Sequence, residues 1–184
     1  MTTERRVIFV PDDYWTNPPK ENTMNIDPHH AADLRRAGVC IKHHVHGNQE
    51  GVNVVLEEVN DVGRSGQFVH SLLATLDAVS KQLLTEPGLR ALDEGLATVA
   101  NPAYDPSQMV PEYWRRAACL TIAYGRGDQD GVNAVWLGEE SVTPITLSLI
   151  DVYAMLIPSI STSVGMQIVD NGISTLVGIE AEGH

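Results

Sequence analysis

The chain has 184 residues, of which 43% are hydrophobic, enough to bury a core in one domain or in two small ones. Its 24 acidic and 12 basic residues give a formal net charge of −12, which repels phosphate backbones and argues against ordinary nucleic-acid binding. The polar N-terminus is followed by only four apolar residues, too few for a signal-peptide core or a membrane span. These features predict a soluble cytoplasmic protein without membrane contacts.

The first 27 residues predict an extended arm. Residues 7–10 (Val-Ile-Phe-Val) favour a short strand, whereas residues 11–25 contain three prolines and three asparagines, which oppose regular structure. Tyr14 and Trp15 place two large aromatic rings on this arm, and such rings often anchor contacts. Two roles remain open: the arm folds back over a groove on its own bundle, or it reaches a neighbouring subunit or partner.

Capping residues mark the first two predicted helices. Asp27 is an N-cap residue, and Pro28 after it is suited to a first helical turn. Gly47 predicts the end of this helix, and Asn48 predicts the cap of the next one, which ends near Gly63. Apolar spacing predicts six further helices, over 67–84, after 85–87, through 114–120, through 135, and over 143–157 and 163–179.

The second half of the chain repeats the first. When residues 35–55 are aligned without a gap on 115–135, nine of 21 positions are identical. Further matches follow after a three-residue shortening, namely Gly88, Asp93, Gly95 and Thr98 with Gly165, Asp170, Gly172 and Thr175. The sequence therefore predicts an all-α fold of about eight helices, a tandem duplication of a roughly 75-residue four-helix module.

The predicted organisation is an arm (1–27), a first module (28–102) and a second module (103–184). The offset between the copies is longer than the repeats of roughly 33–47 residues that build helical solenoids. Two copies of a small domain are expected to pack about a pseudo-two-fold axis, as a fused dimer would. Both modules then form either separate units or one domain.

Matched charged residues have two interpretations. The arginine pairs 35–36 and 115–116, with Asp93 and Asp170, predict salt bridges between the first and fourth helices of each module. Alternatively, these arginine pairs, including Arg36 and Arg116, bind an anion or a partner carboxylate. The matched helical glycines predict close helix crossings, with a backbone approached by a ligand as the alternative; they are Gly51, Gly131, Gly95 and Gly172.

A histidine cluster is the strongest chemical signal. His43, His44 and His46 lie at the end of the first helix, and a metal site would use His43, His46 and Glu50. The second copy argues against this site, because it has Ala123, Tyr124 and Arg126 at the histidine positions. Histidines near a helix C-terminus are also favoured by the helix dipole.

No catalytic motif is repeated in both copies. Cys40 is a candidate nucleophile beside the histidines, but a lone cysteine on an amphipathic helix usually packs in the core. We therefore expect a protein without a cofactor that binds a protein partner or itself, as a homo-oligomer or in a larger particle, and is not an enzyme. Its predicted interaction residues are Tyr14, Trp15, Arg36 and Arg116. The alternatives are a metal-dependent enzyme that uses the histidines, and an acidic DNA mimic.

Overall fold

A computed structural model describes residues 26–104, 110–136 and 142–182. Within these ranges the fold is all-helical, as predicted, and contains no strand. The helices are α2 (Pro28–Val45), α3 (Gln49–Asp61), α4 (Ser65–Leu83), α5 (Glu86–Ala100), α6 (Glu112–Gly125), α7 (Gln129–Trp136), α8 (Val142–Leu156) and α9 (Ser163–Glu182), with short 3-10 helices η1 (Pro102–Tyr104) and η2 (Pro158–Ser161). The predicted arm, with Tyr14 and Trp15, lies outside the described residues except for its last two positions.

The helix ends follow capping signals in the sequence. The Asp27 carboxylate accepts a hydrogen bond from the backbone N–H of His30 at 3.3 Å, and Pro28 begins α2. The chain turns from α2 to α3 through Gly47, whose φ of +67° is a left-handed conformation that favours glycine. Gly127, with φ of +66°, makes the same turn between α6 and α7. The helix end predicted at Gly47 is therefore confirmed, and the second half has the same turn at Gly127.

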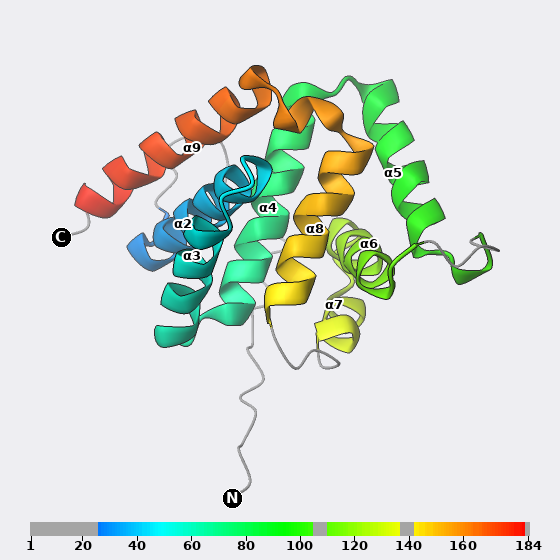
Figure 1. The fold of residues 1–184 in the computed structure, drawn as a ribbon, viewed down its shortest axis with the longest axis horizontal. Coiled ribbons are helices and arrows are strands. Elements are labelled where there is room, and N and C mark those ends of the chain that lie inside the picture. Colours follow the sequence, from blue (N-terminus) through cyan, green and yellow to red (C-terminus); the bar gives the residue numbers. More distant parts are fainter. Residues whose placement is uncertain (1–25, 105–109, 137–141, 183–184) are drawn as a thin grey trace, which may run out of the picture.

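The helices of the two halves are interleaved. Figure 1 shows α4 and α8 in the middle of the molecule, where they contact each other. α2 packs on α4 and also contacts α3, while α6 packs on α8 and also contacts α7. The last helix, α9, lies along α2, and α5 lies along α6. The fourth helix of each half thus packs on the first helix of the other half.

This exchange corrects one expectation from the sequence. Asp170 was expected to pair with the arginines of its own half, but its carboxylate binds Nζ of Lys42 in α2 at 2.7 Å. Nearby, Glu180 of α9 binds Nε of Arg35 at 2.7 Å. The expected pairing of Asp170 was wrong because α9 packs along α2. The expected pairing of Asp93 was also wrong, because Arg35 and Arg36 bind Glu180 and Glu58 instead.

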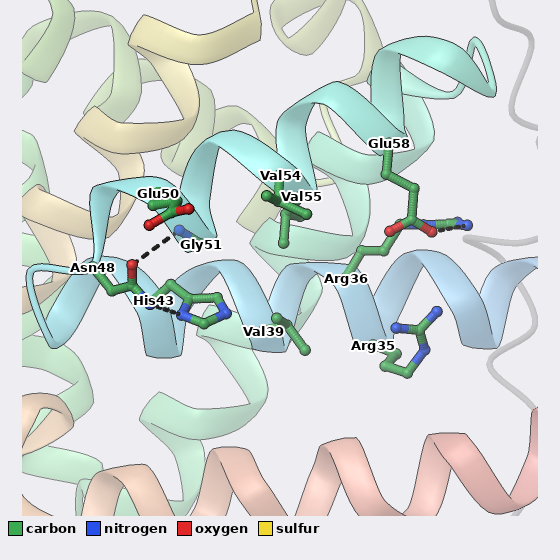
Figure 2. Close-up of a pocket in the computed structure, with 10 residues that line it drawn as sticks. All are labelled: Arg35, Arg36, Val39, His43, Asn48, Glu50, Gly51, Val54, Val55 and Glu58. Atoms are coloured by element: carbon green, nitrogen blue, oxygen red, sulfur yellow. Dashed lines mark hydrogen bonds and ion pairs between the residues drawn. The ribbon is translucent and has the colours of Figure 1, made fainter.

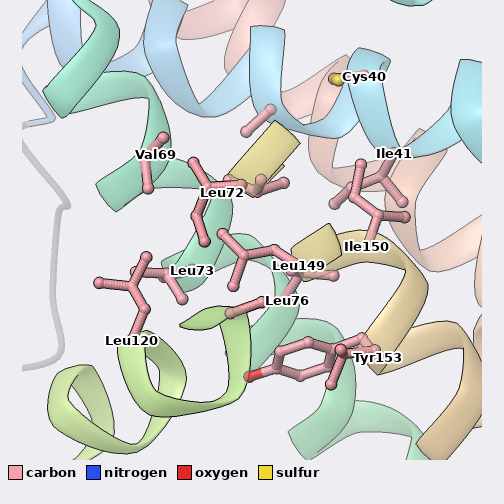
Figure 3. Packing of buried hydrophobic residues seen from close by; sticks show 14 of the residues in the cluster. Cys40, Ile41, Val69, Leu72, Leu73, Leu76, Leu120, Leu149, Ile150 and Tyr153 are labelled. Carbon is pink, nitrogen blue, oxygen red and sulfur yellow. The ribbon is translucent and has the colours of Figure 1, made fainter. Parts of the chain in front are cut away.

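One hydrophobic core joins the two halves. Figure 3 shows its centre, where buried side chains of α4 and α8 meet residues of α2 and α6; the labelled members include Ile41, Leu72, Leu73, Leu76, Leu120, Leu149, Ile150 and Tyr153. Each large aliphatic side chain removed from water stabilises the fold by about 1.5–3 kcal/mol. The described parts of both predicted modules therefore depend on the same buried cluster. No helix in the described ranges has the length and apolar character needed to cross a membrane.

Three of the four matched glycines lie where a side chain would collide. A Cβ at Gly51 would overlap the ring of His43, and one at Gly131 would lie 2.5 Å from Oδ2 of Asp128. A Cβ at Gly95 would lie 2.8 Å from Cδ2 of Leu156. Close packing therefore accounts for these three positions. Gly172 differs, because a Cβ there would meet no atom within 4 Å.

Two glycines of α9 give opposite expectations for alanine. A Cβ at Gly165 would lie 2.5 Å from the carbonyl oxygens of Ser159 and Ile160, and backbone atoms cannot move aside cheaply. We expect Gly165→Ala to lower the free energy of unfolding by about 1–3 kcal/mol. Gly172→Ala should instead raise it by about 0.5–1 kcal/mol, because alanine is the better helix former. Urea denaturation followed by circular dichroism measures both, and equal effects would contradict the expectation.

Candidate functional site

A groove between α2 and α3 is the candidate site. Its volume is about 340 Å³, and Figure 2 shows the side chains around it. The lining residues are Arg35, Arg36, Val39 and His43 from α2, Asn48 from the turn, and Glu50, Gly51, Val54, Val55 and Glu58 from α3. Val54 is 59% exposed, a large exposed fraction for an aliphatic side chain in the middle of a groove. The groove therefore combines an apolar centre with charged ends.

The turn between the two helices builds one end of the groove. Oδ1 of Asn48 accepts a hydrogen bond from the N–H of Gly51 at 3.0 Å and so caps α3. The Asn48 amide lies 3.0 Å from Nδ1 of His43, whose ring covers Gly51. The absence of a side chain at Gly51 thus lets the imidazole pack on the first turn of α3.

An ionic network builds the other end. Arg36 binds Glu58 of α3 at 2.8 Å and Asp33, one turn earlier in α2, at 3.2 Å. Asp33 is fully buried, and Nε of Arg64 lies 2.9 Å from its Oδ2. Because a buried carboxylate is costly unless it is paired, this network holds the Arg36 side chain against α3.

Two charges in the groove retain bonding capacity. Arg35 uses Nε to bind Glu180, while its two Nη groups bond no described residue. Glu50 is exposed, and its carboxylate makes no hydrogen bond or ion pair among the described residues. Figure 2 shows Arg35 at one end of the groove and Glu50 at the other, with Val39, Val54 and Val55 between them. A cation and an anion are therefore available at opposite ends of an apolar surface.

The structure does not assemble the candidate metal ligands. His43 packs on the α3 turn, whereas Nδ1 of His46 lies 2.7 Å from the Lys42 carbonyl oxygen. Nε2 of His44 lies 2.7 Å from the Asp151 carboxylate of α8. No three histidine, cysteine, aspartate or glutamate side chains in the described ranges are grouped to hold a metal ion. The three imidazoles thus have separate partners, and Glu50 completes no ligand set with His43 and His46.

Cys40 lies in the core rather than in the groove. Its side chain is fully buried, and this burial raises the pKa of the thiol to about 12. A thiol with such a pKa carries almost no thiolate at neutral pH, and thiolate is the nucleophilic form. Cys40 therefore has the character of a small core residue.

The second half has a related but altered surface. Nη2 of Arg116 donates to the carbonyl oxygen of Val135 at 3.2 Å, whereas the matched Arg36 binds carboxylates. At the positions of His43 and Val54 the second half has the smaller residues Ala123 and Ala134. The predicted interaction residues Arg36 and Arg116 therefore have different surroundings.

Comparison of the chain with protein-family models, with curated proteins and with solved structures gave no significant match.

Sequence reasoning missed the valines and the buried carboxylate. Val54 is apolar but lies outside the buried stripe of α3. An apolar residue on the exposed face of the helix was therefore the signal available in the sequence. Asp33 precedes Ala37, Cys40 and Ile41 at helical spacing, and a charge in that register indicates a buried ion pair. Arg64, its partner, has no comparable signal, because the contact spans 31 residues.

Proposed function

We propose that the protein is a non-catalytic protein–protein interaction or assembly component. Its contact surfaces are the α2–α3 groove and the N-terminal arm with Tyr14 and Trp15. The observation that carries the proposal is the exposed Val54 at the centre of an open groove whose two ends are charged. An apolar centre within a polar rim is typical of surfaces that bind proteins. Arg36 belongs to the rim of this surface.

We also propose that the chain arose by duplication of a four-helix module, with its two halves related as in a fused dimer. Corresponding capping bonds support this: Gly51 N–H to Asn48 at 3.0 Å and Gly131 N–H to Asp128 at 2.9 Å. The side-chain pair Gln49–Asn53, at 3.0 Å, recurs as Gln129–Asn133, at 3.4 Å. The reciprocal packing of α9 on α2 and of α5 on α6 is the exchange expected of a swapped pair.

Solution mass tests the assembly role. Light scattering would compare the full chain with a variant lacking residues 1–25, which keeps the Asp27 cap of α2, and metal content would be determined on both samples. We expect a metal-free oligomer or complex that is lost when the arm is removed. A monomer in both samples would contradict assembly through the arm. A monomer that carries one metal ion per chain, lost in His43→Ala and His46→Ala variants, would favour the metal-dependent alternative.

A further inference from the structure

The polarity of the α2–α3 groove suggests which segment it accepts. From the Arg35 end to the Glu50 end, a ligand meets an available guanidinium, then the valines, then an available carboxylate. A complementary chain therefore carries acidic residues, then about four apolar residues, then basic residues. The Val54 side chain in the centre would lose its contact with water when such a chain binds.

The N-terminal segment of this chain has this order. Read toward the N-terminus, residues 13–12 are two aspartates, residues 10–7 are Val, Phe, Ile and Val, and residues 6–5 are two arginines. In an extended conformation the four apolar residues span about 10 Å. The groove has a matching length, since the eight-residue step from Glu50 to Glu58 along α3 rises about 12 Å.

The connection to α2 sets the direction. The chain enters α2 at Pro28, and Arg35 lies about 10 Å further along the helix, nearer to this entry than Glu50 is. Residues 14–25 join the segment to the described fold and can span up to about 40 Å. A segment that runs back from Pro28 along α2 therefore meets Arg35 first and Glu50 last. Tethering also favours the groove of the same molecule, because short linkers give millimolar effective concentrations.

We propose that residues 5–13 of the chain dock in the α2–α3 groove of the same molecule. Asp12 and Asp13 face the Nη groups of Arg35, residues 7–10 cover Val39 and Val54, and Arg5 and Arg6 face Glu50. This inference rests on the proposed function in taking the groove as a contact surface, and it names what covers that surface in the free protein. A partner that uses the groove must then displace the segment.

Disulfide trapping tests the docking in the full-length chain. In a Cys119→Ser background, which removes the exposed thiol, Val54→Cys is combined with either Ile8→Cys or Phe9→Cys. Side chains alternate along an extended segment, so one of the two pairs should form an intramolecular disulfide much faster than the other. The matched control replaces Ala134, the counterpart of Val54 in the second half. If neither pair reacts faster than its Ala134→Cys control, docking is contradicted.

Charge reversal provides a second readout. Chymotrypsin cleavage after Phe9, which lies within the docked segment, should be slow while the segment is docked. Arg35→Glu should accelerate it about fivefold, the effect expected for loss of an exposed ion pair. Adding Asp12→Arg and Asp13→Arg to Arg35→Glu should restore slow cleavage, whereas Arg115→Glu, the matched change in the second half, should have no effect. If Arg35→Glu accelerates cleavage but adding Asp12→Arg and Asp13→Arg does not slow it again, the proposed register is contradicted.

The outcomes separate this inference from the assembly proposal. An intramolecular disulfide supports the docking, and light scattering of the untrapped protein tests assembly separately, because a partner can still displace the segment. A disulfide between two chains overturns docking within one molecule and places the segment of a second copy in the groove. Non-reducing gel electrophoresis and intact mass distinguish these products.

Discussion

Replacing Asp33 by alanine is expected to lower the free energy of unfolding by about 3 kcal/mol. The carboxylate is fully buried and binds both Arg64 and Arg36, so its loss leaves the Arg64 guanidinium without its acceptor and Arg36 with Glu58 alone. Removing one partner of a fully buried pair costs about 3–5 kcal/mol, and the low end applies because the Arg64 side chain is 31% exposed. Urea denaturation followed by circular dichroism measures the change.

Asp77→Ala is the matched control for this variant. Asp77 pairs with Lys81 at 2.7 Å on the surface of α4, where the two side chains are 43% and 61% exposed. Its loss should cost less than about 0.5 kcal/mol. Similar effects of the two substitutions would show that the Asp33 network does not act as a buried brace. The Asp33 variant should also loosen the contact between α2 and α3 at the Arg36 end of the groove, because Arg36 links Asp33 to Glu58.

The stability of the protein should fall as the pH decreases from about 6.5 to about 4, partly because of His70. Burial in α4, together with the nearby His30, lowers the pKa of His70 from 6.5 to about 4. The unfolded chain therefore binds this proton first, so stability is complete above pH 6.5 and declines as the pH falls. The difference in pKa corresponds to a loss on the order of 3 kcal/mol by pH 4.

The variant His70→Leu isolates this contribution. Leucine occupies the matched position 147 in the second half, so the replacement follows the chain's own pattern. Denaturation between pH 4 and 7 should show a shallower decline for His70→Leu than for the unchanged protein. His29→Leu, which alters an exposed histidine, should retain the original decline. If both variants behave like the unchanged protein, protonation of His70 does not limit stability in this range.

Local chemistry made the helices predictable. Asp27 with Pro28, and Asn48 after Gly47, act within a few residues of where they stand, so the helix starts and turns follow from neighbouring positions. The apolar stripe of α3 at Val52, Val55, Leu56 and Val59 is buried, as its spacing predicts. The groove was harder to predict from neighbouring residues. Of its lining, Arg36 was predicted as an interaction residue and Glu50 as a candidate metal ligand.

Contacts between distant helices followed from the packing instead. Helical spacing indicates which face of α9 is apolar, but it does not choose between α2 and α6 as the surface that this face covers. Because α9 packs on α2, Asp170 binds Lys42 rather than the arginines of its own half. The histidines show the same limit of local reasoning. Their spacing predicts that they lie near each other, but it does not predict that the three rings contact Asn48, Asp151 and the Lys42 carbonyl separately. Capping and periodicity are local properties of the chain, whereas ion pairs and the groove depend on which helices bury their apolar faces against each other.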